Sequence, residues 1–398
     1  MIRKAPKRGS STAPRWKRPL FAALGVLVFA LAVFLILVGV IGLSSCSQPG
    51  AGPAGGNNGS TGGSGKVIKT YAGTGSPGST GDNASALKAT LNTPMGLYVD
   101  KLGYVYIADA GNNEVRFVNL SGVIQPAAGE YSPGYTSDGV APTSSKLYTP
   151  TAVTLDPSGN MYIADSFNSR VREVTGTIST YAGNGTPTFA GDTGLATAAS
   201  VAFPSGVCFD AHGNCYIADS SNHRVRVVSA SSLKITTYAG DGNSGSTGNN
   251  GPATSATLID PYAVVMDSSG NLYISDSTAN VVRKVNSSGT ITTYAGTGTA
   301  NYSGDNGPAN QAALDGPAGL ALDSSGNLYI ADSYNNRIRM VNAGGIITTV
   351  AGNGTPGFSP DGTAATSASL LVPMGVAVDS SGTIFIADTG NSVVRTVK

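Results

Sequence analysis

The 398-residue sequence is poor in charge, histidine, cysteine and tryptophan. Charged residues make up only 12% of it, which argues against a helical bundle, because exposed helix faces need charged side chains. Three cysteines are too few for a disulfide framework and lack the spacing of a four-ligand zinc site. Glycine occurs 54 times but not at every third position, which excludes a collagen-like chain. With many Tyr, Val, Ile and Thr residues, the composition is typical of an all-β protein.

Acidic residues are absent before Asp82, whereas seven basic residues precede residue 20. Without those seven, 17 basic residues face 23 acidic ones, a net charge of about −6 on the rest of the chain. A mildly acidic body argues against nucleic acid as a partner, since phosphate binding needs a basic surface.

A run of 24 residues without a charged or polar side chain, Leu20 to Leu43, follows the basic segment. Such a run can cross a membrane as a helix, and the basic residues before it predict a cytoplasmic N-terminus. The run ends in Leu43-Ser44-Ser45-Cys46, which resembles the lipobox of bacterial lipoproteins and implies lipidation of Cys46. It is longer than an ordinary signal-peptide core, so an uncleaved signal anchor stays open, as does ordinary secretion.

We therefore expect three parts: residues 1–46 as a basic segment with a signal peptide or membrane anchor, 47–65 as a flexible Gly/Ser-rich linker, and 66–398 as the folded domain. Lipidation or anchoring would hold that domain on the extracytoplasmic side of the cell membrane or the outer membrane. The membrane is then one partner of the chain.

One pattern recurs six times in residues 66–398 and is marked by an (Ala/Ser)-Asp dipeptide. The marker aspartates are Asp109, Asp165, Asp219, Asp276, Asp332 and Asp388, separated by 56, 54, 57, 56 and 56 residues. An arginine follows each marker by seven residues: Arg116, Arg172, Arg226, Arg283, Arg339 and Arg395.

Each copy has the pattern of four short strands with turn residues between them. In one copy these are 319–322, 327–331, 337–341 and 345–351. Four antiparallel strands at constant spacing are typical of a β-propeller blade. The sixth copy lacks a fourth strand, and residues 66–73 have the sequence of one with nothing before them to pair with. The sequence therefore predicts six blades, closed by residues 66–73 as the outer strand of the last blade.

The stretches from Gly319 to Val341 and from Gly206 to Val228 follow the pattern Gly-x-x-x-Asp-(x)3-Asn-x-Tyr-Ile-Ala-Asp-(x)2-Asn-x-Arg-x-Arg-x-Val, with Cys215 at the variable position before the tyrosine of the second stretch. In this pattern the chain resembles the NHL-repeat family, which implies a six-bladed propeller. The repeats here are longer than is common in that family, because each carries an insert between its fourth strand and the next first strand. An Asp nine residues after the Gly that ends the fourth strand recurs in every insert, with Asn249 in its place once.

The repeated Asp and Arg residues are interpreted as structural, because a catalytic group is needed once whereas a fold-specifying residue is needed in every blade. No catalytic residue and no metal ligand set is predicted, and no cofactor, with calcium the one ion left open. His212 and His223 fall in turns expected on opposite faces, which argues against a zinc site. Cys208 and Cys215 lie in neighbouring strands of one repeat, where packed thiols and a disulfide both remain open.

We expect the inserts to form a rim around one mouth of the central channel, with the binding site there. Aromatic residues at irregular positions in or near the inserts are the candidate ligand contacts: Tyr131, Tyr135, Tyr148, Phe189, Tyr302 and Phe358. Unmatched charges near the first strands are Lys88, Lys146, Asp260 and Asp315. The preferred function is a non-catalytic, membrane-tethered module that binds a protein, peptide or glycan. The alternative is a metal-dependent propeller enzyme, a lyase or lactonase-like hydrolase, as the family resemblance also implies.

Overall fold

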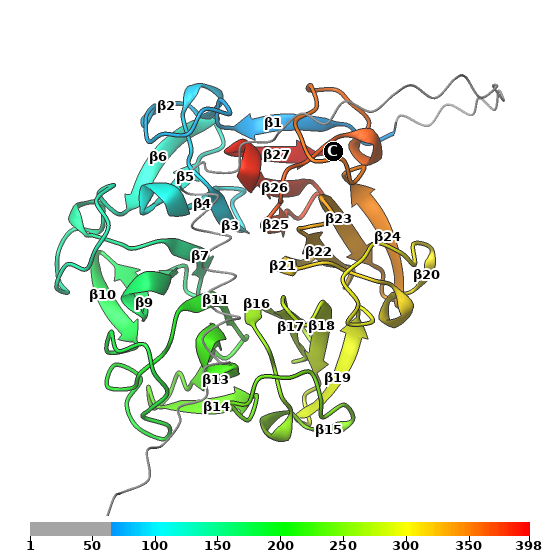
Figure 1. Ribbon diagram of the computed structural model, residues 1–398. Coiled ribbons are helices and arrows are strands. Elements are labelled where there is room, and N and C mark those ends of the chain that lie inside the picture. The colour runs from blue at the N-terminus through cyan, green and yellow to red at the C-terminus, as the bar shows by residue number, and fades with distance from the viewer. Residues whose placement is uncertain (1–64) are drawn as a thin grey trace, which may run out of the picture. The chain divides into compact units, whose positions relative to one another are not determined.

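Six antiparallel β-sheets surround a central channel in the computed structural model, which describes residues 65–398 (Figure 1). The innermost strands contact one another in a closed cycle, β3, β7, β11, β16, β21, β25 and again β3. The prediction of an all-β, six-bladed propeller is confirmed. The predicted anchor, its Cys46 and the linker up to residue 64 lie outside the described residues.

The blades are numbered in chain order, each from its inner strand outward. Blade 1 contains β3 (Pro94–Val99), β4 (Val105–Asp109), β5 (Glu114–Val118), β6 (Val123–Ala128) and the short β2 (Ala84–Ser85). Blade 2 contains β7 (Pro150–Leu155), β8 (Met161–Asp165), β9 (Arg170–Thr175) and β10 (Thr177–Ala182). Blade 3 contains β11 (Pro204–Phe209), β12 (Cys215–Asp219), β13 (Arg224–Val228) and β14 (Ile235–Ala239). Blade 4 contains β16 (Pro261–Met266), β17 (Leu272–Asp276), β18 (Val281–Val285), β19 (Thr290–Ala295) and the short β15 (Gly251–Pro252). Blade 5 contains β21 (Pro317–Leu322), β22 (Leu328–Asp332), β23 (Arg337–Val341), β24 (Ile346–Ala351) and the short β20 (Gly307–Pro308). Blade 6 contains β25 (Gly375–Val378), β26 (Ile384–Asp388), β27 (Val393–Val397) and β1 (Ile68–Ala72).

The helices of residues 65–398 are single 3-10 turns, and none is long and apolar enough to cross a membrane. One set lies in the inserts: η1 (Ala86–Lys88), η3 (Pro142–Ser144), η6 (Ala253–Ser255), η7 (Ala309–Gln311) and η8 (Ala365–Ser367). The other set directly follows the marker aspartates: η2 (Ala110–Asn112), η4 (Ser166–Asn168), η5 (Ser220–Asn222) and η9 (Thr389–Asn391).

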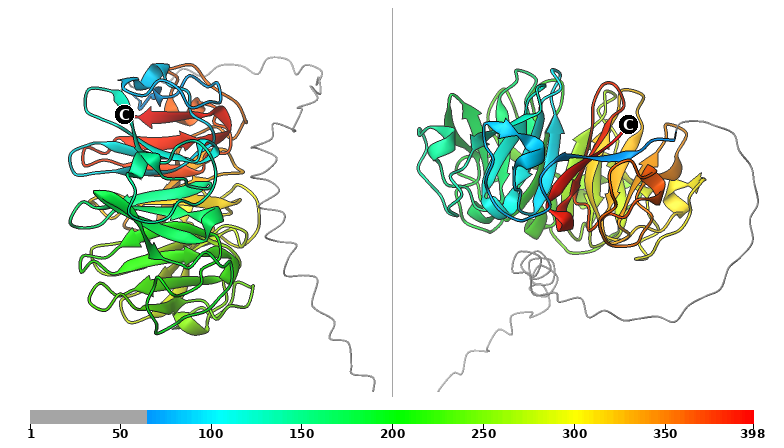
Figure 2. Two further views of the ribbon diagram at one scale, coloured as in Figure 1. Left: turned by 90° about the vertical axis from the view of Figure 1, so that its left-hand side faces the viewer. Right: turned by 90° about the horizontal axis from the view of Figure 1, so that it is seen from above.

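The ring is closed by β1, which pairs with β27 at the other end of the domain. Lys69 lies opposite Thr396, 327 residues later, and Ile68 lies opposite Val397. Figures 1 and 2 show the two strands side by side. The predicted closure is confirmed, because β1 covers an edge of blade 6 that would otherwise be open.

The inserts reach further than the predicted rim at one mouth. The short β2 in the first insert pairs with the outer strand β6, so the insert covers the outer edge of blade 1. After it, Ala86, Ala89 and Leu91 are buried between blades 6 and 1 together with Phe385. The inserts keep a constant length because they carry part of the core between adjacent blades.

A fully buried arginine joins each insert to its blade. In blade 5, Arg339 Nη1 lies 3.2 Å from Oδ2 of the marker Asp332, and Nη2 lies 2.6 Å from Oδ1 of the insert residue Asp305. The marker itself accepts the backbone N–H of Asp315 at 2.8 Å, just before β21. These contacts are of the kind expected from the predicted structural role of the marker Asp and Arg residues, which stays a prediction.

Blade 4 is the one in which the insert acid is replaced by an amide. Arg283 Nη2 donates to Asn249 Oδ1 at 3.0 Å, and Arg283 Nε has no hydrogen-bond partner within residues 65–398. Burial lowers the pKa of Arg283, which the nearby Asp276 partly offsets. We expect Asn249→Asp to raise the free energy of unfolding by about 1 kcal/mol, because a carboxylate accepts more strongly from guanidinium. Urea denaturation will measure this, and an unchanged or lower stability would contradict it.

Candidate functional site

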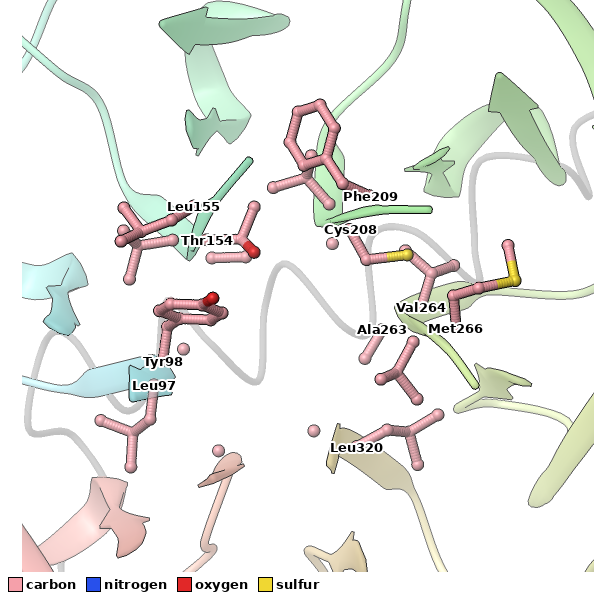
Figure 3. A pocket seen from close by; sticks show the side chains of 18 of the residues that line it. Leu97, Tyr98, Thr154, Leu155, Cys208, Phe209, Ala263, Val264, Met266 and Leu320 are labelled. Atoms are coloured by element: carbon pink, nitrogen blue, oxygen red, sulfur yellow. The ribbon is translucent and has the colours of Figure 1, made fainter. Parts of the chain in front are cut away.

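A cavity of about 530 Å³ opens at the end of the channel where the first and second strands of each blade are joined. Its walls are the first strands of the blades, and its outer rim includes Lys101, Asp156 and Asp210 from these turns. Figure 3 shows side chains from β3, β7, β11, β16 and β21 around it. A concave, mainly apolar space of this size is the usual form of a small-ligand site.

The inner strands approach closely because each has a glycine or an alanine at the same depth of the channel. These small residues are Gly96, Ala152, Gly206, Ala263, Gly319 and Gly375. A Cβ atom on Gly206 would lie 2.5 Å from the carbonyl oxygen of Tyr262 in the next blade, and one on Gly375 would lie 2.0 Å from that of Met95. Glycine at these positions therefore lets the blades close tightly around the channel, and this layer of small residues lines the cavity.

The floor of the cavity is formed by side chains that cross the channel. Tyr262 of blade 4 reaches the opposite blade, where its hydroxyl lies 3.9 Å from Sδ of Met95. Met374 is also buried at this level. Burial raises the pKa of Tyr262, with a further contribution from Asp260, so its hydroxyl stays protonated at neutral pH. The channel is therefore closed partway along its length.

The cavity is asymmetric because equivalent positions carry side chains of different size. At one such position of the first strands, blades 1 to 3 have Tyr98, Thr154 and Cys208, whereas blades 5 and 6 have Ala321 and Ala377. Among the walls, Leu155, Val264 and Leu320 supply aliphatic surface (Figure 3). A cavity with such uneven walls can accept a ligand in one orientation.

The rim is acidic, because each first-to-second turn begins with an aspartate. In blade 4, Asp267 Oδ1 accepts the backbone N–H groups of Ser269 and Asn271, both at 2.9 Å. Partial burial alone would raise the pKa of Asp267, but hydrogen bonds from these residues outweigh it and the pKa lies below its ordinary value. The equivalents are Asp100, Asp156, Asp210, Asp323 and Asp379. Lys101 is a basic residue in the first-to-second turn of blade 1.

Four of the six predicted ligand contacts occupy one equivalent position in the inserts of their repeats, so their placement is regular. Each covers a buried arginine. The Phe189 ring centroid lies 4.8 Å from Cζ of Arg226 and 3.9 Å from that of Arg224. The other three rings are those of Tyr135 over Arg170 and Arg172, Tyr302 over Arg337 and Arg339, and Phe358 over Arg395.

The remaining two lie elsewhere. Tyr148 packs on Phe167, with ring centroids 5.1 Å apart, and Phe167 packs in turn on Phe203 at 5.4 Å. Tyr131 is 58% exposed. The structure therefore does not gather the six predicted contacts at one point, and none of them lines the central cavity. Their role in binding stays a prediction.

The other mouth of the channel carries two of the unmatched acids. Asp260 accepts the hydroxyl of Thr278 at 3.4 Å, and burial raises its pKa to about 6. Burial also raises the pKa of Asp315. Tyr334 is close to both carboxylates, since each contributes to raising its pKa after burial.

The cysteines of blade 3 are free thiols. Cys208 pairs with Tyr216 and Cys215 pairs with Phe209, so the two cysteines are one position out of register and point to opposite faces of the sheet. Cys208 accordingly packs against blade 4 and Cys215 against blade 2. A disulfide, which remained open from the sequence, is excluded by this geometry.

The two histidines lie at opposite ends of blade 3, as predicted. His212 belongs to the first-to-second turn, whereas His223 follows η5 and its Nδ1 lies 2.6 Å from the carbonyl oxygen of Ile259. Residues 65–398 contain no group of three His, Cys, Asp or Glu side chains placed to hold one metal ion.

The cavity walls were not identified from the sequence as a site. Of its residues, Cys208 was considered only as a packed thiol or half of a disulfide, and Tyr98, Phe209 and Leu320 were not singled out. A comparison of side-chain size at equivalent first-strand positions was the available signal, since Tyr98 stands where blades 5 and 6 have alanine.

Comparisons with known families agree with the repeat pattern. The Teneurin NHL domain matches residues 297–360, and the NHL repeat matches residues 202–228. Protein SUPPRESSOR OF QUENCHING 1, chloroplastic, of Arabidopsis thaliana is 29% identical over 227 residues, 52% of this chain and 21% of that protein. NHL repeat-containing protein 2 of Homo sapiens is 32% identical over 167 residues, 37% of this chain and 22% of that protein. The chain spans about a fifth of the length of these relatives, and the matches support its likeness to the NHL family.

Among solved structures, an auxiliary nutrient binding protein from Bacteroides thetaiotaomicron superposes with a TM-score of 0.60. The likeness covers 84% of this chain and 76% of that one, at 16% sequence identity. At this identity the likeness concerns the fold.

Proposed function

We propose that the propeller is a non-catalytic binding module whose ligand inserts an apolar group into the central cavity. The observation that carries the proposal is the cavity itself, about 530 Å³ in volume, closed at its floor and walled mainly by aliphatic and aromatic side chains. A propeller with the same overall fold occurs in an auxiliary nutrient binding protein, which supports a binding role for this architecture.

The site is proposed at the first-to-second turns and not at the inserts. At the insert positions, the aromatic side chains of Tyr135, Phe189 and Tyr302 are engaged by buried arginines. The cavity walls, by contrast, include Leu155 and Leu320, which are only partly buried. Covering the exposed part of such a side chain contributes up to about 1 kcal/mol to binding.

The module is further proposed to be tethered outside the cytoplasm through the N-terminal segment. The support is the order of a basic stretch, the apolar run from Leu20 to Leu43, and Cys46. Radiolabelled palmitate is expected to label the chain and not its Cys46→Ser variant. An unlabelled chain that is still protected from extraction by alkaline carbonate would indicate the uncleaved anchor, and a soluble chain would contradict the tether.

Binding can be tested by screening the full chain in detergent against peptides, oligosaccharides and lactones by thermal shift. We expect a ligand that raises the melting temperature, is not chemically altered, and binds about tenfold more weakly to Leu155→Gln and to Leu320→Gln, because each variant places an amide in the apolar wall. Ser324→Gln is the matched control, since Ser324 is exposed in a first-to-second turn and does not line the cavity.

Two outcomes would overturn the proposal. A ligand whose affinity is the same in all three variants would place the site elsewhere. A compound that is turned over, together with calcium or zinc bound in a one-to-one ratio by metal analysis, would favour the metal-dependent enzyme.

A further inference from the structure

A groove of about 620 Å³ lies between blades 2 and 3 and adjoins the central cavity. The two spaces share Asp156, Pro157, Phe209 and Ala211 as lining residues, so Phe209 stands between them. The two spaces are therefore adjacent, one in the channel and the other further out between two blades. Two adjacent spaces favour a chain-like ligand, which can place a different group in each, over a compact one.

The groove occurs where the repeats depart from one another. The distance from the marker Asp to the glycine after the fourth strand is 20 residues in blades 1, 4 and 5, but 18 in blade 2 and 21 in blade 3. In blade 2 the shortening reduces the β9–β10 connection to Gly176, between the paired Thr175 and Thr177. The longer β13–β14 connection of blade 3 contributes Leu233 to the groove. The connection between the third and fourth strands is thus shorter in blade 2 and longer in blade 3, the two blades that border the groove.

The walls of the groove combine exposed apolar surface with negative charge. Leu195 is 55% exposed and Leu233 is 51% exposed. Asp156 and Glu173 also line it, and no lysine or arginine does so among residues 65–398. Glu173 Oε1 accepts the hydroxyl of Tyr162 at 2.7 Å, and Glu173 makes no ion pair with the described part of the chain. The groove therefore suits a basic group beside apolar ones and disfavours an anionic ligand.

We propose that this joint site binds an extended peptide segment that places an apolar side chain in the central cavity and a lysine or arginine in the groove, against Asp156 and Glu173. The inference rests on the proposed function, which supplies the apolar anchor. An extended peptide advances about 3.3 Å per residue and points successive side chains to opposite sides, so one segment presents both groups at separate points. Thr197 is exposed in the groove, where its hydroxyl can accept a peptide amide.

The test is selection from a displayed library of random decapeptides with the full chain in detergent, followed by fluorescence anisotropy of the selected peptides. We expect the selected sequences to share an aromatic or aliphatic residue at a fixed spacing from a lysine or arginine. Raising NaCl from about 0.05 to about 0.5 M should weaken binding severalfold, because a partly exposed charge pair is screened. Replacing the basic residue of the peptide with glutamine should weaken it about tenfold.

Glu173→Gln is the diagnostic variant, because glutamine keeps a carbonyl oxygen for the Tyr162 hydroxyl while it removes the charge. We expect about tenfold weaker binding with an unchanged melting temperature. The matched control is Glu130→Gln, since Glu130 is likewise part-exposed and pairs with Lys146 at 3.8 Å outside the groove. This control should bind with the affinity of the unchanged chain.

The two proposals fail in different ways. Peptides that bind without a shared basic residue, are weakened by Leu155→Gln and are unaffected by Glu173→Gln would overturn the cationic peptide and leave the apolar cavity site standing. If peptides bind but are unaffected by Leu155→Gln, Leu320→Gln and Glu173→Gln alike, they bind elsewhere and the peptide inference is wrong. If the library yields no peptide while an oligosaccharide binds the cavity, the peptide inference is wrong and the cavity site stands.

Discussion

Ile68→Asp is expected to lower the free energy of unfolding by about 4 kcal/mol or more, because it places a carboxylate in the core at the point where the ring closes. Ile68 is completely buried and packs with Leu370, Ile384 and Val397. The charged side chain would either remain there without a partner or detach β1 from β27. Detachment would open the outer edge of blade 6 and separate the two ends of the domain.

The adjacent residue provides the control. Lys69 is exposed and lies opposite Thr396 in the same strand pair, so Lys69→Asp introduces the same side chain on the solvent side of β1. It should change stability by less than about 1 kcal/mol. Urea denaturation followed by circular dichroism measures both variants. Equal effects, or a small effect of Ile68→Asp, would show that β1 contributes little to ring closure.

Asp219→Ala is expected to destabilise the domain by about 3–5 kcal/mol, because it leaves the buried Arg226 without the carboxylate that faces it. Asp219 and Arg226 both have fully buried side chains, and Arg226 Nη1 lies 3.1 Å from Asp219 Oδ2. The same carboxylate accepts the backbone N–H of Ala202 at 2.7 Å and the amide of Asn222 at 2.8 Å. The substitution therefore removes the partner of a buried cation and two hydrogen bonds, one to the segment before β11 and one to the turn after β12.

The second carboxylate that pairs with Arg226 provides the comparison variant. Asp192 also pairs with Arg226, but its side chain is 31% exposed. Because water can replace part of this contact, Asp192→Ala should cost about 1 kcal/mol. Denaturation of the two variants at one pH measures the difference. A larger loss from Asp192→Ala than from Asp219→Ala would mean that the insert contact, and not the marker, holds the arginine.

Repetition explains why the structural residues could be recognised from the sequence. The marker aspartates and their arginines recur at one spacing, and all of them are fully buried in the structure. The aromatic residues over the arginines follow the same logic, since Tyr135, Phe189, Tyr302 and Phe358 stand at one constant distance before their markers. In the other two repeats this position is occupied by Ser79 and Ser246. Because only four of the six repeats have an aromatic residue here, the aromatic residues by themselves do not show the repeat.

The sequence of residues 66–398 was by itself enough to predict the number of blades, the four strands of each blade and the closure by the first strand. These features depend on the local alternation of apolar and polar residues and on spacings that repeat along the sequence. Only the tertiary structure decided where the open spaces of the domain lie. The cavity and the groove arise from side chains that come from separate blades, and Tyr98, Phe209 and Leu320 line the cavity together. Their combined size and charge depend on which strands face each other across the ring, and no spacing within one repeat carries that information.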